Sequence, residues 1–114
     1  MQEQIRDPVF AGYLYPKEKT ELKEIIKTYV QSARIDDLES HNDLKSLIVP
    51  ADGYHFAGNT MAYAYKHAYN SKNVRKVYIV APLTSNGIMG CVLSTSSIYR
   101  CPLGDIRVSL EGNC

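Results

Sequence analysis

The stretch LIVPADGYHFAGNTMAYAYKHAY, residues 47–69, decides the architecture that the sequence predicts. It begins with a short continuous apolar run, passes through a loop with two glycines and ends in an alanine-rich segment. A short apolar run that ends at a proline is typical of a strand buried on both faces, and alanine favours helix. We therefore predict a buried strand at 45–50, a loop at 50–58 and a helix at 59–69.

The sequence on either side extends this pattern. A second apolar run, RKVYIVAP at 75–82, follows the first after roughly thirty residues, which is the spacing of a βαβ crossover. A third strand is predicted at 88–96 and a turn at Pro102 to Asp105. Apolar residues at helical spacing predict a further helix over 18–31. The predicted fold class is α/β, with a βαβ-based, mainly parallel sheet and flanking helices.

The composition limits the class of protein. The chain has 114 residues, of which 45% are hydrophobic and 22% charged, as expected for one small domain spanning residues 1–114. A formal net charge of +1 provides no field that would attract nucleic acid or an anionic membrane. The sequence has neither a stretch of membrane-spanning length nor an apolar segment at its N-terminus. We therefore predict a cytoplasmic protein with no nucleic-acid partner and no membrane partner.

Two loops follow the first two predicted strands, where open parallel sheets bind their ligands. Their polar side chains are one carboxylate, one imidazole and a few hydroxyl and amide groups. This set makes no nucleophile–base pair, no phosphate-binding glycine motif and no full set of metal ligands. We assign no catalytic, cofactor-binding or metal-binding residue and expect no cofactor. Weak metal binding by Asp52 and His55 remains an alternative to an Asp-Gly turn with a solvent-facing imidazole.

Five segments, taken in order along the chain, carry a resemblance to a known family. They are DPVFAGYLYP, LIVPADGYHFAG, AYAYK, VYIVAPLTSN and LSTSSIYRCPLGDI. Together they resemble the Memo family, also called AmmeMemoRadiSam system protein B, whose fold is similar to that of the LigB-type class III extradiol dioxygenases. The resemblance covers nearly the whole chain and implies a partial LigB-like α/β/α fold. The family domain is much longer, so the resemblance implies a truncated N-terminal portion of a single Memo-like domain.

The resemblance also shows where this chain departs from the family. The family's first metal-site histidine follows the proline of the first loop, where this chain has alanine, and its second lies in the loop after the second strand. Alanine has no lone pair to give a metal, and neutral hydroxyls are poor substitutes for imidazole. We call the two segments the vestigial site loops. Their residues are Pro50, Ala51, Asp52, Gly53, Tyr54 and His55 in the first loop, and Leu83, Thr84 and Ser85 in the second.

Three functions stay open from the sequence. The favoured one is a non-catalytic, truncated Memo-like protein that retains at most a small-ligand or protein-binding surface. The first alternative is part of a metal-dependent oxidoreductase or dioxygenase-like enzyme that another chain completes. The second is a phosphotyrosine-peptide binding module, although neither loop has the arginine cluster that would hold a phosphate. The expected partners are a protein or peptide, together with self-association through exposed strand edges.

Overall fold

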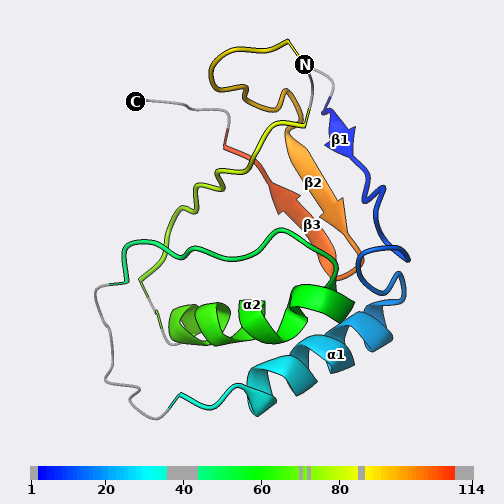
Figure 1. The fold of residues 1–114 in the computed structure, drawn as a ribbon. Coiled ribbons are helices and arrows are strands. Elements are labelled where there is room, and N and C mark those ends of the chain that lie inside the picture. Colours follow the sequence, from blue (N-terminus) through cyan, green and yellow to red (C-terminus); the bar gives the residue numbers. More distant parts are fainter. Residues whose placement is uncertain (1–2, 36–43, 70, 72, 85–86, 110–114) are drawn as a thin grey trace.

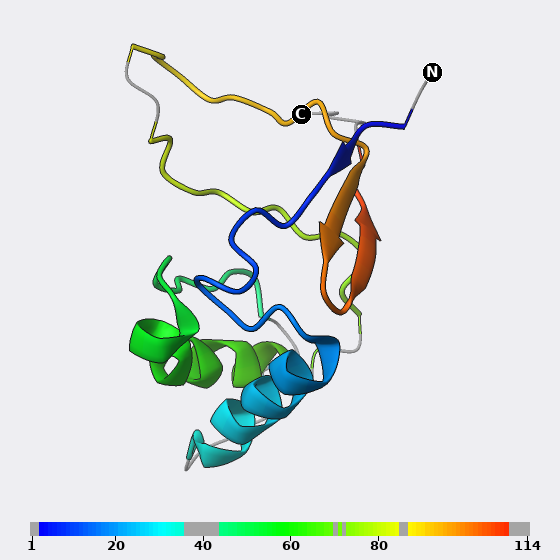
Figure 2. The same cartoon turned by 90° about the vertical axis from the view of Figure 1, so that its right-hand side faces the viewer.

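Two helices and a small sheet make up the regular structure of the chain. The computed structural model describes residues 3–35, 44–69, 71, 73–84 and 87–109. The helices lie side by side at one end of the molecule and the sheet lies at the other (Figures 1 and 2). The helices are α1 (Lys19–Ser32) and α2 (Tyr54–Tyr69), and the strands are β1 (Ile5–Arg6), β2 (Ile98–Cys101) and β3 (Gly104–Arg107). This combination of helices with a mixed sheet confirms the predicted α/β class.

Helix α1 forms where the apolar spacing predicts it, with each end shifted by one residue from the predicted 18–31. The carbonyl of Glu18 accepts the amide of Leu22 at 2.9 Å, which closes the first turn. Leu22 is only 3% exposed and belongs to the apolar face that packs against α2. The helix ends as the amide of Ala33 donates to the carbonyl of Tyr29.

Helix α2 begins earlier than the predicted start at residue 59. The carbonyl of Gly53 accepts the amides of Phe56 and Ala57 at 3.0 and 2.9 Å, so the helical hydrogen bonds start at this glycine. Glycine is an accepted residue at the position before the first helical turn. Much of the loop predicted at 50–58 is therefore the first turn of α2, and that part of the prediction is wrong.

The sheet has the strand order β1–β2–β3 and is mixed rather than mainly parallel. Strands β1 and β2 are parallel, with Ile5 opposite Ile98. Strands β2 and β3 are antiparallel, with Cys101 opposite Gly104. The two residues between them, Pro102 and Leu103, form the turn that the sequence predicts.

The strands predicted at 45–50, 75–82 and 88–96 are wrong. Within the residues that the structure describes, these segments belong to no strand, and the predicted βαβ crossover is not formed. Many of their apolar side chains are exposed, such as Ile48 at 97% and Val80 at 95%, whereas Leu47 and Val49 are half-buried. A buried parallel strand needs hydrogen-bonded neighbours and a covering layer on each face, and apolar sequence alone does not provide them.

The described core is correspondingly small. Its buried hydrophobic residues are Leu22, Ala33, Ala57, Ala62 and Ile98. The first four belong to the two helices or their ends, and Ile98 belongs to β2. None of the described helices has both the length and the hydrophobicity needed to cross a membrane.

Candidate functional site

The first vestigial site loop forms the N-terminal approach to α2. The amide of Gly53 donates to Oδ1 of Asp52 at 2.7 Å, which holds the carboxylate against its own backbone. This places the negative charge just before the helix, where the helix dipole favours it. His55 is exposed, and its ring lies edge-on to Phe56 with ring centroids 5.3 Å apart. Both observations agree with a turn-forming Asp52 and a solvent-facing His55.

Tyr54 attaches this end of α2 to two other parts of the chain. Its amide donates to the carbonyl of Leu14 at 2.8 Å, and its ring lies 5.8 Å from that of Tyr15. Its carbonyl accepts the hydroxyl of Tyr29, on α1, at 3.0 Å. Tyr54 is therefore a structural connection between α2, α1 and the segment that precedes α1.

The surroundings of the Tyr54 hydroxyl favour its protonated form. Burial raises the pKa of Tyr54 above its ordinary value of 10.0, and the nearby ionisable groups of Tyr65, Tyr15 and Cys101 add to the rise. Desolvation disfavours the charged phenolate, and neighbouring negative charges would disfavour it further. At neutral pH this side chain is a neutral hydroxyl rather than a base.

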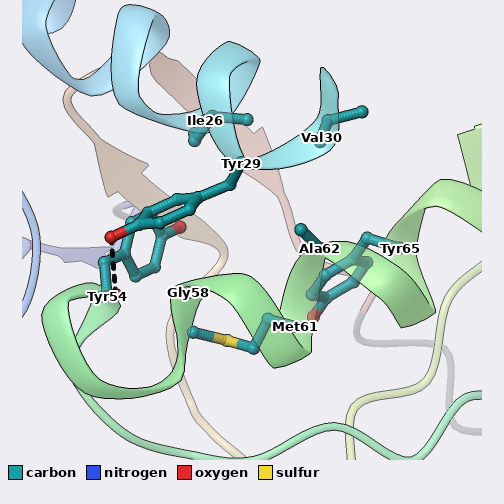
Figure 3. A pocket seen from close by; sticks show the side chains of 8 residues that line it. All are labelled: Ile26, Tyr29, Val30, Tyr54, Gly58, Met61, Ala62 and Tyr65. Carbon is teal, nitrogen blue, oxygen red and sulfur yellow. Dashed lines mark hydrogen bonds between the residues drawn. The ribbon is translucent and has the colours of Figure 1, made fainter. Parts of the chain in front are cut away.

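A groove of about 240 Å³ runs between α1 and α2 (Figure 3). Its lining is almost entirely apolar surface, to which the tyrosines contribute their rings. Gly58 lies directly against Tyr29, because a Cβ at this glycine would be 2.5 Å from Cε2 of the ring. The groove is lined by Ile26, Tyr29, Val30, Tyr54, Gly58, Met61, Ala62 and Tyr65.

The second vestigial site loop lies away from the first. In Figure 1 the yellow-green segment that leads to residue 84 rises to the end of the sheet opposite to the β2–β3 turn, whereas α2 begins on the helical side of the molecule. Leu83 and Thr84 are exposed, as are Pro50 and Ala51. Ser85 lies outside the described residues. The structure therefore does not bring the two loops together into one site.

The described side chains do not fit the metal ion that the family resemblance implies. Ala51 offers no donor atom, Asp52 is held by the amide of Gly53, and Thr84 lies on the separate second loop. No group of three or more His, Cys, Asp or Glu side chains comes together in the part of the chain that the structure describes. Two potential ligands three positions apart, Asp52 and His55, fall short of the three or four protein ligands of transition-metal sites.

Comparison with known proteins assigns the chain to a family. The model of the Memo-like protein family matches residues 6–113. The chain belongs to the Memo-like protein family. No solved structure matches it, so the expected likeness to the LigB-type fold stays a prediction.

Three Memo relatives illustrate how similar the family is to this chain in sequence. The MEMO1 family protein of Nitrosopumilus maritimus is 32% identical over 109 residues, which cover 94% of this chain and 39% of the relative. The memo-1 homolog of Caenorhabditis elegans is 41% identical over 69 residues, or 60% of this chain and 19% of the relative. Protein MEMO1 of Xenopus laevis is 31% identical over 103 residues, which cover 90% of this chain and 33% of the relative. This Memo-like chain therefore spans well under half the length of these relatives.

Sequence reasoning missed the contact between the two helices. Apolar spacing predicts the helix that contains Tyr29, but it predicts neither the hydrogen bond of Tyr29 to Tyr54 nor its fit against Gly58. A signal was present in the sequence, since a glycine inside a helix often marks the close approach of another element. The first vestigial site loop thus contributes Tyr54 to the contact between the helices.

Proposed function

We propose that this Memo-like protein is non-catalytic and works through a binding surface. The observation that carries the proposal is the identity of the side chains at the two vestigial site loops. Ala51 stands where the family resemblance places one metal-binding histidine, and Leu83 and Thr84 stand where it places another. Neither alanine nor leucine can donate to a metal, and a neutral threonine hydroxyl is a weak ligand.

The local contacts support the same proposal. Asp52 is the only carboxylate of the first loop, and its Oδ1 already accepts a backbone hydrogen bond 2.7 Å long. To bind a metal, Asp52 would have to give up this contact at the start of α2. His55 could supply one imidazole, which is too little to hold iron or copper at stoichiometric levels.

A metal titration tests the proposal on the chain itself. Isothermal titration with Fe²⁺ under anaerobic conditions, and separately with Cu²⁺, is expected to show no saturable site with one metal per chain. The Asp52→Ala and His55→Ala variants should give the same trace as the wild type. Glu21→Ala serves as the matched control, because it removes an exposed carboxylate from α1.

One result would overturn the proposal. It is a stoichiometric site for either metal that Asp52→Ala or His55→Ala abolishes and Glu21→Ala leaves unchanged. Such a site would mean that the first loop has replaced its missing histidine by neighbouring ligands.

A further inference from the structure

Strand β3 (Gly104–Arg107) is an outer strand of the three-stranded sheet. Figure 1 shows it on the opposite side of β2 from β1. All four of its residues are exposed, and within the described residues no strand other than β2 pairs with it. The exposed edge of a strand presents unpaired backbone groups to which another strand can add.

The register of the sheet shows which backbone groups this strand offers. The amide of Val108, just after β3, donates to the carbonyl of Ser97 at 2.8 Å. In an antiparallel pair alternate residues turn both backbone groups toward the same neighbour, so Ile106, two positions before Val108, turns its groups toward β2. Asp105 and Arg107 therefore turn their N–H and C=O groups outward, and we call these four groups the β3 edge.

The side chains along the β3 edge match those of a second copy of the chain. Asp105 and Arg107 lie on one face of β3 and Ile106 on the other, because successive residues of a strand alternate. When two β3 strands lie antiparallel and centred on Ile106, each Asp105 lies opposite the partner's Arg107, and the two Ile106 side chains lie opposite each other. Opposite charges and apolar side chains in such positions stabilise a strand pair. The outward backbone groups of each copy then face those of the other at hydrogen-bonding positions.

The same pattern disfavours other registers. A pair centred on Asp105 would place two carboxylates opposite each other, and a pair centred on Arg107 would do the same with two guanidinium groups. Like charges directly opposite each other destabilise a strand pair. A slip of one residue would place Asp105 opposite Ile106, whose backbone groups face β2, so the hydrogen bonds between the copies would be lost. The residues of β3 therefore specify one antiparallel register.

Both charged side chains are available for this pairing. Arg100 holds the Asp105 carboxylate from the β2 side, with Nε 3.1 Å from Oδ1. An ionised carboxylate has lone pairs for further donors, so this contact leaves room for a second arginine. The side chain of Arg107 is 84% exposed, and its ion pair with Glu3 has a distance of 3.5 Å. Little therefore holds the Arg107 guanidinium away from a second copy.

We propose that two copies of this chain associate through their β3 edges, in the antiparallel register centred on Ile106, and form one continuous sheet. The inference goes beyond the proposed function, because this contact involves neither of the vestigial site loops. Strand β3 has only four residues, so the contact buries less than the area of about 1,600 Å² that is standard for protein–protein interfaces. We therefore expect a weak dimer that forms as the concentration rises, and that added salt weakens by screening its exposed ion pairs.

Sedimentation equilibrium of the 114-residue chain, with a chelator present, tests this contact. We expect a monomer–dimer equilibrium for the wild type. Asp105→Arg alone and Arg107→Asp alone should each weaken the dimer at least tenfold, because each places like charges opposite each other. An equimolar mixture of the two variants should associate like the wild type, since the arginines of one variant then lie opposite the aspartates of the other. Lys23→Glu is the control, because it reverses an exposed charge on α1 and should leave the dimer unchanged.

Amide hydrogen exchange gives a second readout that needs no variant. The amides of Asp105 and Arg107 should exchange more slowly at high than at low concentration of the wild-type chain, because they become hydrogen-bonded only in the dimer. The amide of Ile106 faces β2 and should show no such dependence on concentration.

Three results would overturn the inference. One is a wild-type chain that stays monomeric up to its limit of solubility. Another is a dimer that both charge-reversal variants leave intact, or that forms without slowing exchange at Asp105 and Arg107, since either would assign the contact to another surface. The third is failure of the mixed variants to associate although each retains the circular dichroism spectrum of the wild type.

Discussion

At the scale of single residues, Tyr54 shows how a family site loop serves a structural role in this chain. Its amide and carbonyl join α2 to Leu14 and to Tyr29, and its ring packs near that of Tyr15. The adjacent residues of the loop, Asp52 and Gly53, start the helix through their own contacts. The loop has thus kept the residues that fix its shape, while Ala51 stands where the resemblance places a ligand.

The raised pKa of Tyr54 makes stability depend on pH at the alkaline end. The folded chain holds the phenolic proton more tightly than the unfolded chain does, so this stabilisation is complete below the ordinary pKa of 10.0. It is lost as the pH rises through the higher pKa of the folded state. We expect the free energy of unfolding in urea to fall above pH 10 in the wild type, and to fall less steeply in the Tyr54→Phe variant.

Tyr13→Phe is the control for this prediction. Tyr13 is 83% exposed, so its replacement should leave the alkaline slope of the wild type unchanged. Equal slopes for wild type and Tyr54→Phe would show that burial does not perturb the Tyr54 hydroxyl.

At the scale of elements, the packing of α1 against α2 depends on Gly58. A methyl group at this position would be 2.5 Å from Cε2 of Tyr29 and 2.7 Å from Cζ. The ring cannot move away freely, because its hydroxyl donates to the carbonyl of Tyr54. Helix propensity alone would make alanine more stable than glycine by about 1 kcal/mol. Overpacking typically costs about 1–3 kcal/mol and opposes that gain.

We therefore expect Gly58→Ala to destabilise the chain by up to about 2 kcal/mol in urea unfolding. In a Tyr29→Ala background the clash is removed, so the same substitution should become stabilising. Asn59→Ala changes an exposed position of the same helix and should behave alike in both backgrounds. If Gly58→Ala stabilises the wild type as much as it stabilises the Tyr29→Ala variant, the close contact does not affect the free energy of unfolding.

Elements with their own local signals were predictable from the sequence. The apolar face of α1 and the Pro102 turn are encoded within a few residues, and both appear where predicted. The early start of α2 was missed because Gly53 and Gly58 suggest a loop, although Gly53 starts the helix and Gly58 fits against Tyr29. Strand β1 was missed because it has only two residues, both exposed.

The predicted buried strands failed for a different reason. The apolar runs at 45–50 and 75–82 have the composition of central strands, but a strand exists only with a neighbour, which local sequence cannot reveal. The same limit applies to the prediction of the candidate site. The residues of the vestigial site loops were identified by type, but their proximity depended on those strands lying next to each other. Without that pairing, the first loop leads into α2 and the second belongs to a coil segment outside the sheet.

At the scale of the whole molecule, the chain combines a well-packed helix pair with long stretches of uncovered apolar sequence. The buried residues Leu22, Ala57 and Ala62 hold α1 and α2 together, whereas Ile79 and Val80 face solvent. The matched region makes up 39% and 33% of two Memo relatives, so those proteins extend well beyond it.

The most direct test of the proposed function is the iron and copper content of the purified chain, measured by plasma mass spectrometry after exposure to each metal. We expect far less than one metal ion per chain, because Ala51, Leu83 and Thr84 stand where the family resemblance places histidines. One tightly held metal ion per chain would contradict the proposal, because the chain would then bind a metal without those histidines.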